Sequence, residues 1–206
     1  MQLRFATNLT DEQYVKTQAW RDATLPRCPL HPSGGCGFAR HGTYERVVPP
    51  GTRIARWYCP EGHRTFSLLP DCLAARTSGT LEEVEAVVRA VEQAPSLESA
   101  AQSLRLDIEL PGALRWLRRR VHAVHRALHL LKGLRPELFA TCPSTLLAFG
   151  QLLALTGVLV GLREIAAVHL HVLPPPLGLR PPLAPGGEVK PPFQHRVGPD
   201  PPAVQA

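Results

Sequence analysis

Five side chains that bind soft metal ions stand close together in the first third of this chain. Cys28, His31 and Cys36 form one group, and Cys59 and His63 form a second. Structural Zn²⁺ takes four nitrogen or sulfur ligands in a tetrahedron, and a tight turn can supply two of them when they are two to four residues apart. Both groups contain such a pair. The sequence therefore predicts a zinc site.

The two groups offer five candidates for four positions. Cys28, Cys59 and His63 are the expected ligands, and the fourth position is open between His31 and Cys36. The spacing favours His31, because only two residues separate it from Cys28. Cys36 is favoured by the Gly that follows it and by the aromatic strand beyond, which are typical of the second half of a zinc knuckle.

A β-hairpin is expected to hold the two groups together. Thr43–Val48 and Thr52–Tyr58 are rich in β-branched and aromatic residues, and Pro49-Pro50-Gly51 between them supplies a turn. Arg64–Leu69 has the composition of a third short strand. We therefore predict a small β-rich zinc ribbon over residues 26–72.

Helical patterns follow the ribbon. Thr80 opens a first helix with a capping box, Pro95 ends it, and a second, short helix is expected over Leu97–Leu104. Pro111 suits the first turn of a third helix, which Gly133 is expected to end. Three helices in this order, with a short second one, fit a helix-turn-helix layout.

The third helix is strongly basic. The chain has a formal charge of +6, and no carboxylate lies between Leu110 and Pro136. Like charges three and four residues apart destabilise a helix, unless a partner such as phosphate takes up the charge. We therefore expect nucleic-acid contacts, most simply with double-stranded DNA, from six residues: Arg115, Arg118, Arg119, Arg120, His122 and Arg126.

An uncharged stretch of 18 residues, Thr145–Leu162, is long enough for a membrane span to be considered. Gln151, Thr156 and three Gly residues argue against a span, as does the charged pair Arg163-Glu164 directly after it. We expect instead a helix packed on the third helix, and no membrane contact.

The fold class expected from these patterns is α+β. The segments are a polar leader with one short helix (1–25), the zinc ribbon (26–72), the helix-turn-helix-like region (78–135), the apolar helix (143–170) and a disordered Pro-rich tail (171–206). The first residues lack the apolar core of a signal peptide, so a cytoplasmic location is expected, where clustered Cys and His favour metal over disulfides.

The ribbon and the helices after it resemble the N-terminal region of insertion-sequence transposases. In those proteins a Cys-Pro knuckle leads into a Gly-aromatic strand, and the second knuckle runs into an Arg-Thr-Phe-Ser segment, which is Arg64–Ser67 here. The resemblance covers about residues 26–125, and it extends to an uncharacterised bacterial family of stand-alone proteins. It implies zinc binding and a helix-turn-helix that contacts DNA.

The chain departs from the resemblance in what it lacks. A transposase of this kind needs three carboxylates to hold two metal ions, whereas only Glu164, Glu188 and Asp200 follow Leu138. We therefore expect no enzyme activity, but a zinc-stabilised DNA-binding protein, transposon-associated or regulatory. The alternative is a zinc-ribbon adaptor whose helices bind a protein partner.

Overall fold

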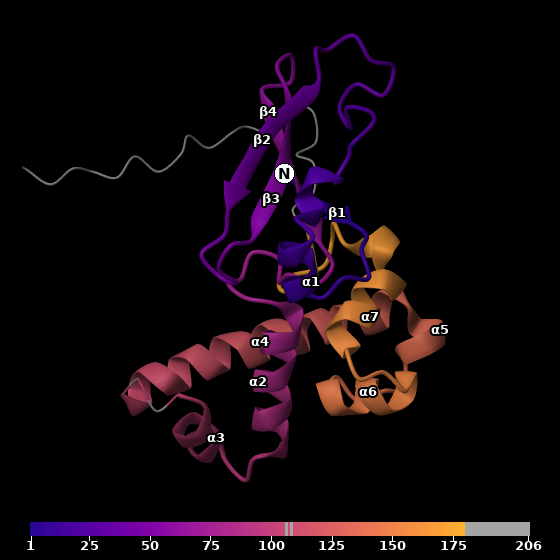
Figure 1. Cartoon of the computed structure of the whole chain (residues 1–206). Helices are drawn as coiled ribbons and strands as arrows, with labels where there is room; N and C mark the ends of the chain where they lie inside the picture. The colour runs from indigo at the N-terminus through magenta and orange to yellow at the C-terminus, as the bar shows by residue number, and fades with distance from the viewer. Residues whose placement is uncertain (106, 108, 180–206) are drawn as a thin grey trace, which may run out of the picture.

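The computed structural model describes residues 1–105, 107 and 109–179, and it has the expected α+β architecture. A small sheet with its loops forms one part of the molecule, and the helices lie beneath it (Figure 1). The sheet contains β1 (Gln2–Phe5), β2 (Ala39–Glu45), β3 (Arg53–Cys59) and β4 (Arg64–Pro70), in the order β1-β4-β3-β2. The hairpin and the third strand predicted for the ribbon are present, but the first strand of the hairpin runs over Ala39–Glu45 and not over Thr43–Val48.

The first 25 residues belong to the sheet and its core. β1 pairs with β4 in parallel, and α1 (Asp11–Lys16) and a 3₁₀ turn (Ala19–Arg21) follow it. Tyr14 and Trp20 are buried against Ala55 and Leu68 of the sheet. This segment, expected to be a polar leader, therefore covers one face of the sheet.

The three helices predicted after the ribbon lie close to their expected bounds. They are α2 (Leu81–Gln93), α3 (Leu97–Leu104) and α4 (Leu110–Leu134), and a single turn, α5 (Pro136–Phe139), comes after them. Side chains of α2, α3 and the first half of α4 share a small core, with Ala100, Ala101 and Leu117 at its centre. The second half of α4 packs in the main core, with Val124, Leu128 and Leu131 fully buried.

The apolar stretch forms two helices rather than the single one predicted. α6 (Leu146–Leu153) and α7 (Val158–Ile165) meet at a bend of 70°, and Ala154 has a left-handed backbone with φ 52°. Both helices pack on α2, and α6 also contacts α4. Among the described residues no single helix is long and apolar enough to cross a membrane; α6 and α7 meet that criterion only as a bent pair.

Two carboxylates of α2 hold the N-termini of these helices. Glu92 accepts hydrogen bonds from the backbone N–H groups of Leu146 and Leu147, at 2.8 and 2.9 Å. Two helical turns earlier on α2, buried Glu85 accepts a hydrogen bond from Leu159 N–H at 2.8 Å. Helix N-termini carry unpaired N–H groups and a partial positive charge, so both contacts stabilise the bent pair.

Arg163 of α7 joins the helices to the sheet region. Its side chain is fully buried, and its two terminal nitrogens donate to four carbonyl groups, those of Pro70, Asp71, Leu73 and Pro176. Burial lowers the pKa of this guanidinium to about 10, which leaves it charged at neutral pH. One cation therefore fixes the end of β4, α7 and the segment after residue 170.

That last contact corrects the predicted boundary of the tail. The residues from 171 to 179 pack on the main core, where Leu173, Leu177 and Leu179 are buried. The sequence suggested a tail from residue 171 because the segment is rich in proline. That composition gave no sign that these three leucines would be buried. The remainder of the predicted tail, residues 180–206, lies outside the described part of the chain.

Candidate metal centre

Four of the five predicted ligands come together in the ribbon. Cys28, His31, Cys36 and Cys59 each offer a ligand atom, and these four atoms all lie within 4.8 Å of one another. His31 Nδ1 is 3.6 Å from Cys28 Sγ and 3.3 Å from Cys59 Sγ. This group can hold a metal ion.

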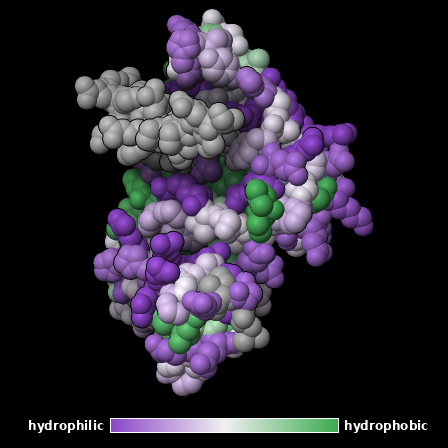
Figure 2. Space-filling model, turned by 90° about the vertical axis from the view of Figure 1, so that its left-hand side faces the viewer, coloured by the Kyte–Doolittle hydropathy of each residue, from purple (hydrophilic) through white to green (hydrophobic). Residues whose placement is uncertain are grey.

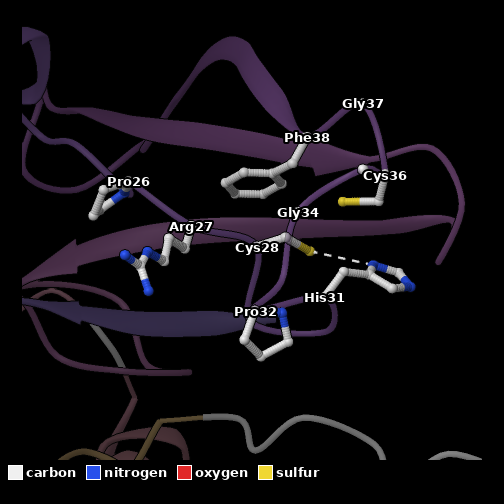
Figure 3. Close-up of a pocket in the computed structure, with 10 residues that line it drawn as sticks. Pro26, Arg27, Cys28, His31, Pro32, Gly34, Cys36, Gly37 and Phe38 are labelled. Atoms are coloured by element: carbon white, nitrogen blue, oxygen red, sulfur yellow. Dashed lines mark hydrogen bonds between the residues drawn. The ribbon is translucent and has the colours of Figure 1, made fainter.

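A loop before β2 positions three of the ligands. Successive turns bring His31 N–H to the Cys28 carbonyl at 3.2 Å and Gly34 N–H to the His31 carbonyl at 3.0 Å. In Figure 3 the side chains of Cys28 and His31 point toward each other, whereas Arg27 points away from them. The path of this loop depends on glycine, since Gly34 has φ +85°, a left-handed conformation that few other residues adopt.

The fourth ligand comes from the end of the hairpin. Cys59 is the last residue of β3, and its sulfur accepts a hydrogen bond from Gly62 N–H at 3.2 Å. Space is short at this turn, because a Cβ on Gly62 would lie 2.6 Å from Leu30 Cδ1. Glycine at this position therefore leaves room for the end of the Leu30 side chain beside the turn.

The structure corrects the ligand set at one position. His31 and Cys36, which the sequence left as alternatives, both belong to the cluster, and His63 does not. His63 has a left-handed backbone with φ 46°, and its exposed ring lies 3.5 Å from the Tyr58 hydroxyl. The turn after Cys59 thus directs His63 away from the sulfur atoms. Spacing within the first group already favoured His31.

Three of the four ligands lie in an apolar core of the ribbon, and His31 is partly exposed. Cys28, Cys36 and Cys59 are buried together with Phe66, and the ring of Phe38 packs over them between Phe66 and Trp57. Low solvent access of this kind suits a site that stabilises the fold. Four protein ligands also complete a tetrahedron, so the donor set resembles structural rather than catalytic metal sites.

The thiols differ in their electrostatic surroundings. Burial raises the pKa of Cys28, but hydrogen bonds from His31, from the backbone and from Cys59 outweigh burial, and the resulting pKa is about 7. Burial, together with the neighbouring Cys28 thiol, raises the pKa of Cys36. On the outer side of the cluster, Glu61 lies 3.6 Å from His31 Nε2, where it can orient the ring with Nδ1 toward the sulfur atoms.

The basic residues predicted on the third helix mostly share one exposed stripe of α4. Arg115 and the residues three, four, seven and eleven positions further on lie on the same helix face, and all of them are exposed: Arg115, Arg118, Arg119, His122 and Arg126. The opposite face is buried. Figure 2 views the side on which α3 and the first turns of α4 lie, and hydrophilic residues cover most of it.

Arg120 differs from the other five. It is half-buried, and its guanidinium carbon lies 4.0 Å from the centre of the Trp116 ring, with Arg105 at 4.7 Å from the same centre. Burial, and then the charge of Arg105, lower the pKa of Arg120. Its role is therefore to pack the turn between α3 and α4 rather than to extend the stripe.

Comparisons with protein-family models, curated proteins and solved structures found no match to this chain.

Proposed function

We propose that this protein is a zinc-stabilised DNA-binding protein that acts by binding and not by catalysis. The ribbon would hold one Zn²⁺ through Cys28, His31, Cys36 and Cys59, and α4 would contact the phosphates of a duplex. The resemblance of residues 26–125 to transposase N-terminal regions agrees with this function, and on that reading the chain is a transposase-derived or regulatory protein.

The donor set supports zinc over Mg²⁺ and Ca²⁺. Three thiolates and one imidazole match the ligands of structural zinc sites, whereas Mg²⁺ and Ca²⁺ prefer oxygen ligands. A zinc ion would link the loop before β2 to the end of β3. Because the ligands lie before the first strand of the hairpin and at the end of its second strand, the free energy of zinc binding would stabilise the folded ribbon.

The observation that carries DNA binding is the stripe on α4. Its arginines form no salt bridge with any residue that the structure describes, and α4 itself contains no carboxylate. An exposed cationic stripe about three turns long costs a helix free energy in isolation. Duplex phosphates would remove that cost and release bound counterions.

A salt titration of duplex binding tests the proposal. Zinc-loaded protein and a labelled duplex are mixed at increasing salt, and the dissociation constant is read from fluorescence anisotropy. Arg115→Gln with Arg118→Gln should weaken binding about tenfold or more, and should reduce the slope of log K against log salt by about two, one for each lost phosphate contact.

The matched control removes two arginines elsewhere. Arg21→Gln with Arg53→Gln makes the same change in net charge at two other exposed positions, and should leave the slope nearly unchanged. Equal effects of the two double variants would mean that α4 is not the contact surface. Absence of duplex binding by the unchanged protein would favour the adaptor alternative.

A further inference from the structure

One face of the sheet carries cationic and aromatic side chains that the α4 stripe does not include. Residues 14–25 cover the other face, where Ala55, Trp57 and Leu68 lie. Strand alternation places Arg56 and Tyr58 on the opposite side. At the lower end of this face Ile54 packs against the helices, so the part beyond Ile54 is the part that can bind a ligand.

A β-bulge adds two residues of β2 to this face. Arg40 pairs with Trp57 and Thr43 with Ala55, so His41 and Gly42 both lie opposite Arg56. The extra residue shifts the alternation of β2, and His41 and Tyr44 therefore point to the same side although they are three residues apart. Gly42 has φ +80°, a conformation that glycine tolerates best.

Contacts link these side chains in two groups on this face. The guanidinium of Arg56 lies 5.8 Å from the centre of the Tyr44 ring, and the His41 ring meets the Tyr58 ring edge-on at 5.4 Å. The Tyr58 hydroxyl in turn lies 3.5 Å from His63 Nδ1. These contacts make two groups, Tyr44 with Arg56 and His41 with Tyr58 and His63, and the bulge places His41 opposite Arg56. Tyr44 lies opposite Ile54 and packs partly against the main core, so it borders the open part of the face. We call the five residues together the sheet row: Tyr44, Arg56, His41, Tyr58 and His63.

The sheet row is open to a ligand, and the one carboxylate of its strands, Glu45, pairs with Arg53 on the other face. His41 and His63 are exposed, and Arg56 and Tyr58 are half-buried. Arg56 makes no salt bridge with any described residue, and the other outward positions beside it on β4 are Thr65 and Ser67. The row therefore offers positive charge and ring faces together.

We propose that the sheet row binds a single strand of DNA, with bases stacked on Tyr58 and its neighbouring rings and a phosphate held by Arg56. Nucleotide strands are recognised by such combinations of aromatic platforms and cations, because every base has a face that can stack on a ring. Paired bases inside a duplex cannot stack on a protein ring. The choice of DNA over RNA rests on the proposed function. The site for a single-stranded nucleic acid is argued from the sheet row alone.

Binding of a labelled oligothymidylate of about 12 nucleotides to the zinc-loaded full chain tests this site. Tyr58→Leu keeps the apolar bulk but removes the ring, and should weaken binding at least fivefold. Tyr58→Phe should bind as the unchanged protein does. Arg56→Gln should weaken binding about tenfold and lower the salt slope by about one, since one phosphate contact is lost.

Arg53→Gln is the matched control, because Arg53 is an exposed arginine on the same strand that points to the other side. It should bind the oligothymidylate as the unchanged protein does. The proposal is overturned if Arg53→Gln and Arg56→Gln have equal effects. It is also overturned if Arg56→Gln and His63→Ala, neither of which touches the core, leave strand affinity unchanged.

A duplex of the same length and an oligouridylate complete the test. The sheet-row variants should weaken strand binding more than duplex binding, and the Arg115→Gln, Arg118→Gln pair should do the reverse. Failure of the strand site and failure of the α4 site are therefore distinguishable. Equal loss of duplex and strand binding by Arg56→Gln, or binding of the oligouridylate alone, would contradict a site for single-stranded DNA.

Discussion

Cys36 and His63 show how ligand identity is decided in the ribbon. Both stand at plausible distances in sequence from another ligand, but only Cys36 reaches the sulfur atoms. The decisive feature is the turn after Cys59, where the left-handed backbone of His63 directs its ring to Tyr58. Spacing predicts which residues can share a turn; it does not predict the direction in which each side chain leaves that turn.

Single ligand substitutions should separate the true ligands from the neighbour. Purified protein with Cys36→Ala or His31→Ala should bind zinc more weakly by about 100-fold or more. Loss of a residue that only supports a ligand already lowers metal affinity by about 10- to 100-fold, and loss of the ligand itself should cost at least as much. His63→Ala should keep one zinc per chain, because His63 lies outside the cluster. Zinc content is measured with a chromophoric chelator after gel filtration. Zinc loss from His63→Ala, with retention by His31→Ala, would show that the ligand set is wrong.

At the scale of elements, the acidic character of α2 has a structural explanation. Glu85 and Glu92 are seven residues apart and therefore lie on one helix face, and each meets the N-terminus of a following helix. Glu92 also accepts a hydrogen bond from His125 Nε2 of α4 at 2.7 Å. The bend between α6 and α7 is thus supported at both helix starts by side chains of a third helix.

Glu92→Gln should remove part of the stability of the protein in a pH-dependent way. Burial raises the pKa of Glu92, but bonds from His125, Leu146 and Leu147 lower it to a net value below its ordinary 4.5. A depressed pKa stabilises the folded state above the unfolded value, and this stability is lost as pH falls through the folded value.

We therefore expect Glu92→Gln to lower the free energy of unfolding by about 1–2 kcal/mol at pH 7, and the difference to shrink below about pH 4.5. Urea unfolding at several pH values measures this, and the metal centre is common to both proteins. Glu98→Gln, an exposed change on α3, should stay within about 0.5 kcal/mol. A difference that is constant with pH would contradict the ionic cap.

An element can be predicted from the sequence when the residues that determine it lie next to it in the chain. The bounds of α3 and the capped start of α2 are encoded locally, by Ser96 and Thr80, and sequence reasoning recovers them. The pairing of β1 with β4 joins residues more than 60 positions apart, so no local pattern reveals it. The bend at Ala154 depends on Glu85 and Glu92, which lie on another helix.

At the scale of the whole molecule, the segment after residue 170 closes the core. The Ala75 N–H donates to the Pro176 carbonyl at 2.9 Å, and Arg163 donates to the same carbonyl at 2.7 Å. Leu177 is fully buried beside these contacts. The segment thus joins the end of the ribbon to α7, and composition alone misses it because proline dominates the count while leucine does the packing.

Leu177→Ala should lower the free energy of unfolding by about 2–4 kcal/mol, as for other buried leucines that leave a cavity. Val172→Ala, in the same segment but 52% exposed, should change it by less than about 0.5 kcal/mol. Urea denaturation followed by tryptophan fluorescence gives both values. Equal, small effects would mean that residues 171–179 do not contribute to the core.

The position of Cys59 has a consequence for the whole molecule. Tyr58 precedes Cys59 on β3, and His63 ends the turn that follows Cys59. A metal ion at Cys59 and single-stranded DNA on the sheet row would therefore contact the same stretch of backbone. If zinc holds this backbone in the conformation that binds DNA, the two binding free energies are coupled, and the coupling is reciprocal. Zinc would then act as an effector of nucleic-acid affinity, and a bound strand would slow the loss of zinc to competing chelators.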